Sequence, residues 1–569
     1  MSTSAPTQPA SLIDAGASPE EVVVAYHERT KHHFHRYAAS PGHMDWATQP
    51  DPFRRYHGAD LVRLPLAKPG RPLPYWQLYA LGDVPSEPLS LESISLFFRY
   101  ALSLTAWKRF HDTMWSLRAN PSSGNLHPTE GYAVLPAIDR LGDAPAVYHY
   151  APKEHALERR AILGAKAWSE LCTPFPEGSF LVGLSSVHWR EAWKYGERAF
   201  RYCQHDAGHA LATLRIAAAA LGWGLVLLDG MSDRAIAALL GLSRGDDYGT
   251  AEREEPELLA LITPGPPLTS PRLLSGLTAG SIGAQWCGEA NTLSPEHSAH
   301  WPVIDEVAEA TRRSAGVPIT EDFFGFPTYE ELFGVPVRQG LLSAGKAILG
   351  RRSAVAMDGV TAISQEAFFR TLARLMPTRD RRSMPWDAIG WRPRIHLGLF
   401  VHRVEGVPPG LYALARDPEK LAALKGVMRG EFRWERLPSC PPGLPLYLLQ
   451  EGDCRALAAT VSCGQHIAGD GAFSLGMIAD YIDSLTTYGA AFYRNLFWEA
   501  GMVGQVLYLE AEEAGIRSTG IGCYFDDPVH EVFGIASREW QSFYHFTVGG
   551  PLEDTRLTTL PGYDFEEPT

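Results

Sequence analysis

Residues 117–132 read LRANPSSGNLHPTEGY and gather short polar side chains in a tract that contains two prolines. Serine hydroxyls and an asparagine amide can hydrogen-bond the polar edge of a ligand, and glycine lets the backbone approach it closely. The alternative is a structural turn whose serines cap their own backbone. The candidate binding residues are Pro121, Ser122, Ser123, Gly124 and Asn125, with Arg118 and His127 beside them.

A second candidate site lies far along the chain, in the stretch GRRSAVAMD. Arg351, Arg352 and Ser353 place two guanidinium groups and a hydroxyl next to one another. Arginine forks pair bidentately with phosphate oxygens, so this stretch suits a phosphomonoester.

The two stretches fall in two copies of one sequence pattern. The segment YGERAFRYCQHDAGHALATLRIAAAALG from residue 195 resembles YGAAFYRNLFWEAGMVGQVLYLEAEEAG from residue 488, an offset of 488 − 195 = 293. Glycines that fall repeatedly in register argue against chance similarity. The offset places Gly183 on Gly476, Tyr195 on Tyr488, Arg201 on Arg494, Gly208 on Gly501, Gly222 on Gly515, Asp233 on Asp526 and Gly241 on Gly534.

Each copy predicts the same mixture of helices and strands, so we expect an α+β protein. A helix capped by Ser90 or Ser364 comes first, two strands follow, and a long helix ends at Gly222 or Gly515. A short helix and a last strand complete each copy. The predicted organisation is an N-terminal helical extension over 1–59, a first domain over 60–280, a linker with one short helix over 281–340, and a second domain over 341–569.

Composition limits the possible partners and location. The chain has 569 residues and a net charge of −14 (51 Lys and Arg, 65 Asp and Glu), which argues against nucleic acid as the main partner. Seven cysteines without a CxxC motif favour a reducing compartment. The N-terminus lacks the pattern of a signal peptide, and no apolar run approaches ~18 residues. We therefore expect a cytoplasmic protein without a membrane partner.

Histidines crowd the N-terminal segment, but a metal site requires further ligands in a fixed geometry. No acidic or cysteine partner is evident, so we predict no metal site and assign the histidines to a solvated helix. The histidines are His27, His32, His33, His35 and His43.

The motifs NPSSGNLHPTEGY, WKYGERAFRY…GHALATL…LGWG, RRSAVAMDG and VGGPLEDTRLTTLPGY together resemble flavin-dependent proteins of the nitroreductase fold, specifically the SagB-type thiazole/oxazole-forming dehydrogenases. The resemblance covers both copies and nearly the whole chain. Proteins of this fold are usually homodimers with FMN at the dimer interface, and a tandem duplication is similar to such a dimer on one chain.

The resemblance implies a site assembled from both copies. The Pro-Ser-Ser-Gly-Asn turn of the first copy would contact the flavin ring. The second copy would hold the phosphate and place a loop under the ring, although the family often has an acidic residue where Gly522 stands. The second-copy residues are Arg351, Arg352, Ser353 and Arg556 for the phosphate, and Gly520, Ile521, Gly522 and Cys523 for the loop.

The copies differ at these positions. The turn at 121–125 aligns with Pro385-Trp386-Asp387-Ala388-Ile389, which lacks the serines and the asparagine, and the first-copy counterpart of the RRS stretch has a single arginine, Arg71. We therefore expect one composite FMN site per chain. A basic stretch at 26–37, YHERTKHHFHRY, leaves a second flavin as the alternative.

Lys194 and Tyr195 open the long-helix region of the first copy, where the resembled dehydrogenases use a Lys-Tyr pair in proton removal. The second copy has Thr487 and Tyr488. The alternative for Lys194 is a surface lysine near a helix end.

Three functions follow from these observations. The first is oxidation of a thiazoline or oxazoline, in a peptide or carrier-bound intermediate, to the azole. The second is NAD(P)H-dependent reduction of a nitroaromatic, quinone or enone through FMN. The third is a flavin-free scaffold that docks to a peptide-modifying enzyme. Each predicts a pseudo-dimer within one chain, which could dimerise further.

Overall fold

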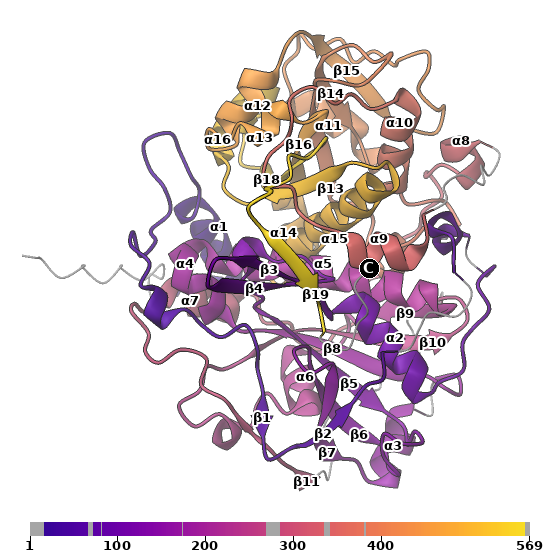
Figure 1. The fold of residues 1–569 in the computed structure, drawn as a ribbon. Helices are drawn as coiled ribbons and strands as arrows, with labels where there is room; N and C mark the ends of the chain where they lie inside the picture. Colours follow the sequence, from indigo (N-terminus) through magenta and orange to yellow (C-terminus); the bar gives the residue numbers. More distant parts are fainter. Residues whose placement is uncertain are drawn as a thin grey trace, which may run out of the picture.

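The computed structural model describes residues 16–66, 72–80, 82–172, 175–268, 285–334, 342–380 and 383–563. The first half of the chain (indigo to magenta) lies below the second half (orange to yellow) in the view of Figure 1, with two long helices between them. Arg71, which the sequence comparison used, lies outside the described residues.

The first half is built on an antiparallel sheet. Helices and loops cover both faces of this sheet. The side chains of its strands β5 (Thr129–Leu135), β6 (Ala146–Ala151), β8 (Phe180–Ser186) and β10 (Glu255–Pro264) are therefore almost entirely buried. The strand order is β11 (Gln285–Trp286), β7 (Ala156–Ile162), β6 (Ala146–Ala151), β5 (Thr129–Leu135), β8 (Phe180–Ser186), β10 (Glu255–Pro264), β9 (Trp223–Leu227), with β2 (Asp60–Arg63) also paired to β7.

The second half repeats this topology. Strands β15, β14, β13, β16, β18 and β17 follow one another as β7, β6, β5, β8, β10 and β9 do in the first sheet. The predicted α+β class and its two tandem domains are therefore confirmed. The strands are β15 (Leu446–Glu451), β14 (Gly410–Leu414), β13 (Ile395–Val401), β16 (Phe473–Asp480), β18 (Trp540–Gly549) and β17 (Arg517–Ile521).

The helices also correspond between the halves. Ser90 and Ser364 cap α2 and α10 as predicted, each accepting a backbone N–H three residues on. Gly222 and Gly515 follow α5 and α15 in the left-handed conformation, which glycine adopts without a steric penalty. The first-half helices are α1 (Pro19–Arg29), α2 (Leu91–Ala101), α3 (Ala165–Cys172), α4 (His188–Tyr195), α5 (Ala199–Ala220) and α6 (Asp233–Leu240). The others are α7 (Pro302–Ala310), α8 (Tyr329–Phe333), α9 (Ala344–Gly350), α10 (Gln365–Arg374), α11 (Leu421–Val427), α12 (Arg455–Val461), α13 (Ile467–Asp470), α14 (Tyr481–Tyr488), α15 (Phe492–Glu513) and α16 (Asp526–Phe533).

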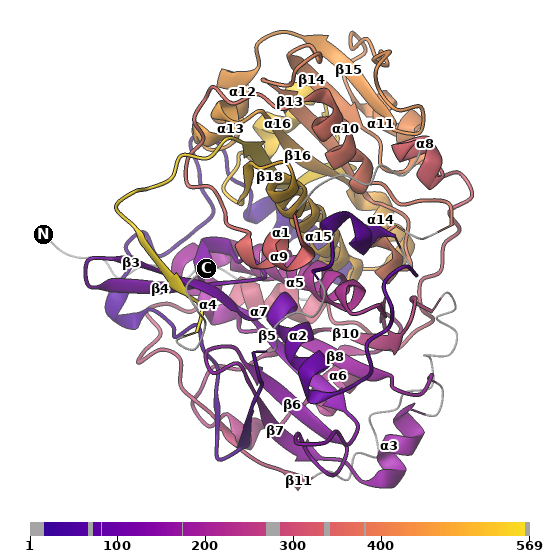
Figure 2. The same ribbon diagram turned by 45° about the vertical axis from the view of Figure 1, so that its right-hand side comes forward.

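The two halves meet where α5 crosses α15 (Figure 2). A Cβ on Gly208 would lie 2.3 Å from the Trp498 carbonyl oxygen, and one on Gly501 would lie 2.3 Å from the His205 carbonyl oxygen. The equivalent glycines therefore let the two backbones touch at the same point of the crossing.

Two equivalent ion pairs cross the same interface. Arg201 pairs with Asp526 at 2.8 Å, and Arg494 pairs with Asp233 at 2.7 Å. All four side chains are buried. Because the offset of 293 exchanges one pair with the other, the halves form a pseudo-dimer within the chain.

The C-terminal end of the chain crosses from the second half to the first. At the C-terminal end, β19 (Thr558–Pro561) pairs with β3 (Leu104–Phe110), which pairs in turn with β4 (Thr113–Arg118). Figure 1 shows the yellow β19 lying against the first half. Near the N-terminus, the short β1 (Tyr56–His57) pairs with β12 (Glu289–Ala290).

The interpretation of the histidine-rich segment as a solvated helix is wrong. Helix α1 ends at Arg29, so only His27 lies within it, and the chain continues to Phe53 with one short 3-10 turn. His27 is fully buried and His32 is 7% exposed, because the segment packs against the second half.

Candidate functional site

A cavity of about 690 Å³ lies between the two halves and contains the turn with which the sequence analysis began. The first half contributes that turn, α5 and the β3–β4 hairpin, whereas the second half contributes the residues after α9 and those of β17 and the following loop. Of the predicted site residues, the lining includes Arg118, Pro121, Ser122, Ser123, Gly124, Asn125, His127, Tyr195, Arg351, Arg352, Ser353, Gly520, Ile521, Gly522 and Cys523.

The polar side chains of the turn largely hold the turn itself. Ser122 Oγ accepts the His127 backbone N–H at 2.8 Å, and Asn125 donates to the Ser116 carbonyl at 2.9 Å. Asn125 and His127 both have positive φ, 61° and 52°, and their side chains are hydrogen-bonded to each other. The turn is thus rigid, and the structural-turn alternative describes part of its role.

Gly124 lies directly against the proposed Lys-Tyr pair. Its φ is 59°, and an added Cβ would lie 2.5 Å from Tyr195 Oη and 3.2 Å from Lys194 Nζ. Lys194 is not among the described lining residues, but its ammonium group borders the turn. Burial raises the pKa of Tyr195 well above its usual value, and the carboxyl of Glu191 adds to this effect.

Two buried carboxyl groups near Tyr195 were missed by the sequence analysis. Asp206 lines the cavity and accepts hydrogen bonds from the Ser123 backbone N–H at 2.9 Å and from its hydroxyl at 3.0 Å. Burial raises the pKa of Asp206 to about 7, against the lowering effect of these bonds. Burial, with Asp206 nearby, also raises the pKa of Glu191, whose two oxygens have no hydrogen-bond partner in the described part of the chain.

Four basic side chains line another part of the cavity, which we call its cationic end. Lys108 and Arg517 line it together with the predicted Arg351 and Arg352. Burial lowers the pKa of Arg352 to about 10, and the charges of Arg351 and Arg517 contribute to the shift. Only Arg517 of the four is within ion-pair distance of an acid among the described residues, with Glu512 at 3.3 Å. This end therefore holds uncompensated positive charge.

The two predicted arginines also join the halves. Arg351 donates to the carbonyls of Arg118 and Ala119, and Arg352 donates to Thr105. Arg351 Nη1 has no partner among the described residues although the side chain is buried.

Arg556 is not brought to this cationic end. Its side chain is 73% exposed and pairs with Asp554 at 2.7 Å, and the residue is not among the described lining. Its charge instead compensates Asp554, which does line the cavity.

Close packing against Tyr202 explains why position 522 is a glycine. A Cβ there would lie 2.4 Å from the ring of Tyr202, and the Gly522 carbonyl accepts hydrogen bonds from Tyr202 and Arg198. A larger side chain would displace Tyr202, which explains why no acidic residue occupies this position.

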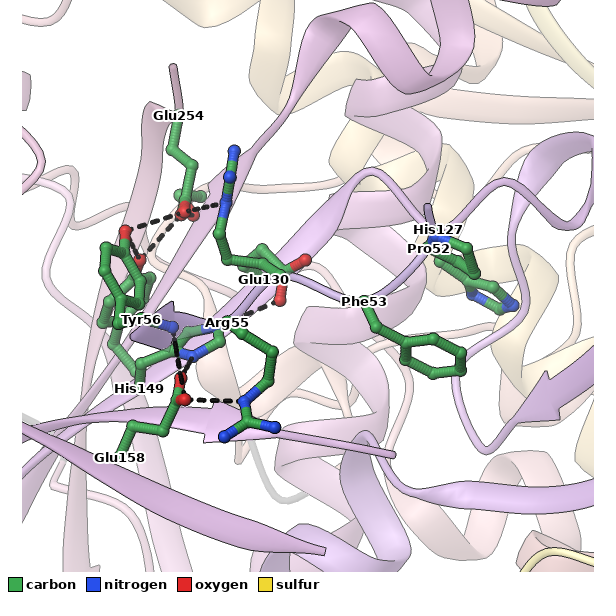
Figure 3. A network of polar contacts seen from close by, with 12 residues as sticks. Pro52, Phe53, Arg55, Tyr56, His127, Glu130, His149, Glu158 and Glu254 are labelled. Carbon is green, nitrogen blue, oxygen red and sulfur yellow. Dashed lines mark hydrogen bonds and ion pairs between the residues drawn. The ribbon is translucent and has the colours of Figure 1, made fainter. Parts of the chain in front are cut away.

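A buried polar network fixes the first-half wall of the cavity. Figure 3 shows Arg55 and His149 converging on Glu158, and Tyr56 reaching Glu254. The hydrogen bonds of His149 to Glu130 and Glu158 overcome its burial and raise its pKa to about 9.

Arg190 connects this network to the turn. It pairs with Glu130 and donates to the backbone carbonyls of His127 and Asp51. Figure 3 shows His127 beside Pro52 and Phe53, so the segment that precedes β1 is held against the turn.

The equivalent place on the other side of the pseudo-dimer has different chemistry. Asp387 stands at the position of Ser123 and forms a buried, bidentate ion pair with Arg215, at 2.7 and 2.9 Å. Arg215 is equivalent to Tyr508 under the offset of 293. A compensated ion pair thus occupies the region that corresponds to the open cavity.

The described residues contain no group of three or more His, Cys, Asp or Glu arranged to hold a metal ion. None of the described helices is both long and apolar enough to cross a membrane.

Comparisons with known proteins agree with this fold. Residues 86–250 and 450–550 match the Nitroreductase family. A candidate nitroreductase of Methanocaldococcus jannaschii is 27% identical over 161 residues, which span 27% of this chain and 76% of that protein.

One solved structure aligns with nearly the whole chain and supports the same fold. The crystal structure of a candidate nitroreductase from Anabaena variabilis aligns with 93% of this chain and 99% of its own, with a TM-score of 0.64 and 22% identity. The Escherichia coli microcin synthetase McbBCD complex contains a chain that aligns over 35% of this chain and 75% of its own, with a TM-score of 0.26 and 19% identity. The chain therefore carries the nitroreductase fold in two tandem copies, and its family match supports an oxidoreductase.

Proposed function

We propose that the chain is an FMN-dependent oxidoreductase of the SagB type, which oxidises a thiazoline or oxazoline in a peptide or carrier-bound intermediate to the azole. The observation that carries the proposal is the inter-domain cavity described above, which combines basic side chains, three of them arginines of the second half, with a Lys-Tyr pair beside a rigid turn of the first half. Its volume of about 690 Å³ lies in the range of cofactor sites.

The cationic end fits a phosphomonoester by charge. Lys108, Arg351, Arg352 and Arg517 face Glu512 and Glu553, while Arg556 compensates Asp554. Four positive charges against two negative ones leave a surplus of two, and a phosphomonoester carries about −1.5 to −2 near neutral pH. The phosphate of FMN would therefore be held by arginines and Lys108, with the Ser353 hydroxyl beside them.

Other parts of the lining fit the polar edge of a flavin. Buried polar atoms of the lining lack hydrogen-bond partners in the described structure, and a flavin edge offers both donors and acceptors to such atoms. These atoms are Arg118 Nε, Asn120 Oδ1, His127 Nδ1, Asp206 Oδ2 and His209 Nδ1.

The chemistry divides between the cofactor and the chain. When bound, the flavin supplies the acceptor for the hydride that leaves the azoline ring. Lys194 would take the proton from the neighbouring carbon, and Tyr195 would orient the lysine or relay the proton. Asp206 and Glu191 lie close enough to influence Tyr195 electrostatically, and Glu191 also interacts with the charge of Lys194.

The experiment uses a thiazoline-containing peptide and measures loss of two hydrogens by mass spectrometry. Lys194→Ala should keep bound FMN and its spectrum, but should lose roughly 10²–10⁴-fold in oxidation rate, as expected for removal of a general base. Tyr195→Phe should lose less. Thr487→Ala, the matched change in the second copy, should oxidise at the wild-type rate.

Oxidation by Lys194→Ala at the wild-type rate would make this lysine a surface residue. A wild-type chain that leaves the azoline unoxidised but reduces a quinone with NAD(P)H would instead favour the reductase function.

A further inference from the structure

The cysteines at the edge of the cavity form a pair that the proposed oxidation does not use. Cys523 lines the cavity directly after the glycine loop, and Cys463 follows α12. Their Sγ atoms are hydrogen-bonded at 2.8 Å, and both side chains are partly exposed. The two thiols are therefore in contact and accessible to small molecules.

The backbone holds the two sulfur atoms together. Gln465 donates its side-chain amide to the Cys523 carbonyl at 2.9 Å and to the Ser462 carbonyl at 2.9 Å. Phe525 donates its backbone N–H to the Val461 carbonyl at 2.8 Å. These bonds join the segment around Cys463 to the segment around Cys523, so the contact between the thiols is part of the fold.

A histidine from the N-terminal extension completes the arrangement. His32 Nδ1 accepts the backbone N–H of Ala38 at 3.0 Å, which leaves Nε2 as the protonated ring nitrogen. His32 also lies close enough to Cys523 for the two side chains to influence each other's pKa.

The surroundings of Cys523 favour its thiolate. The hydrogen bond with Cys463 is the largest influence, burial opposes it, and His32 and Arg198 add to it, so the pKa of Cys523 is lowered to about 5. By contrast, burial raises the pKa of Cys454 to about 12 and that of Cys440 to about 11. Thiolates are the reactive form of cysteine.

We propose that Cys523 and Cys463 form a thiol–disulfide exchange site that reacts with low-molecular-weight disulfides. The Cys523 thiolate attacks one sulfur of the small disulfide, forming a mixed disulfide and releasing one thiolate. The Cys463 thiol then loses its proton and attacks the Cys523 sulfur, forming the Cys463–Cys523 bond and releasing the second small thiol. The chain is oxidised by two electrons and the small disulfide is reduced to two thiols.

This bond would tie the cavity loop to the end of α12. This site combines residues of the N-terminal extension and of the second half, and its reaction does not depend on azoline oxidation. The experiment therefore measures the oxidation state of the thiols rather than turnover.

The experiment treats the purified full-length protein with oxidised glutathione, blocks remaining thiols after denaturation and maps the peptides by mass spectrometry. The wild type should lose two thiols and yield one linked peptide pair containing Cys463 and Cys523. Cys287→Ser, which removes an exposed cysteine far from the pair, should yield the same linked pair. Cys463→Ser should stop at the mixed disulfide and carry one glutathionyl group on Cys523.

A second measurement compares alkylation rates at about pH 6. Because Cys523 is held largely as its thiolate, it should react about tenfold faster than the exposed Cys287, after allowance for the lower nucleophilicity of an acidic thiol. His32→Ala should slow Cys523 and leave Cys287 unchanged. Full retention of both thiols after oxidised glutathione, or alkylation of Cys523 no faster than Cys287, would overturn the proposal.

Discussion

The buried carboxyl of Asp206 gives a prediction that needs no substrate. Asp206→Asn keeps an oxygen that can accept the two hydrogen bonds from Ser123, but removes the ionisable group. The folded pKa of about 7 lies above the ~3.9 of an unfolded aspartate. Between these values the folded chain keeps a proton that the unfolded chain has lost, so the wild-type fold loses stability as the pH rises through this range.

The size of the effect follows from the shift. Three pKa units correspond to about 4 kcal/mol in total, at about 1.4 kcal/mol per unit. Between pH 5 and pH 8 the stability difference between the variant and the wild type changes by about 2–3 kcal/mol of this total, and most of that change occurs below pH 7. The stability of Asp206→Asn relative to the wild type should therefore increase by this amount from pH 5 to pH 8.

The assay is urea unfolding of the flavin-free protein at the two pH values. Asp139→Asn, at a surface position where the side chain is 97% exposed, provides the control for a lost carboxylate. A difference between Asp206→Asn and the wild type that stays constant from pH 5 to pH 8 would show that Asp206 does not hold its proton in the fold, and would refute the reasoning.

Two further predictions concern the cofactor and the domain interface. Arg352→Ala should weaken FMN binding by ~2–5 kcal/mol, or about 30- to 5,000-fold in Kd, whereas Arg433→Ala on the exposed surface should not; a fluorescence titration measures both, and equal Kd values would place the phosphate elsewhere. Gly501→Ala should destabilise the fold by at least the ~1–3 kcal/mol of an overpacked core, because its Cβ meets backbone of α5. In the same unfolding assay Gly426→Ala, in an exposed turn of α11 with open space around the Cβ, should be neutral or slightly stabilising, and equal costs for the two glycines would contradict the close helix crossing.

The sequence predicted the fold through its internal repeat. Glycines in register identified positions where the structure later required them, such as Gly208 and Gly501 at the helix crossing. The offset also paired Arg201 with Arg494 and Asp233 with Asp526, but it could not show that each arginine contacts the aspartate of the other copy. That contact depends on how the copies dock, which a repeat alone does not specify.

The sequence predicted less of the candidate site than of the fold. Motifs led to the turn at 121–127 and to the arginines at 351–352, but Lys108, Asp206 and Arg517 lie outside any motif. Asp206 sits within a helix, where a carboxylate is normally solvated, and only the tertiary fold buries it. A comparison of the copies offered one signal, since an acidic residue recurs at the equivalent position, Glu499.

For the N-terminal histidines, the prediction from the sequence was wrong. Spacing suggested a solvated helix, yet His27 and His32 are buried against the second half. No sequence pattern indicated this contact, because Cys523 and Asp526 lie almost 500 residues away along the chain.

We propose that one composite site per chain binds FMN, since the equivalent region is occupied by the Arg215–Asp387 ion pair. The most direct measurement is the amount of flavin released by denaturing the purified, FMN-saturated protein, divided by the amount of chain. We expect a ratio near one. A ratio near two would show that the second region also binds flavin, and a ratio near zero would contradict the flavin site itself.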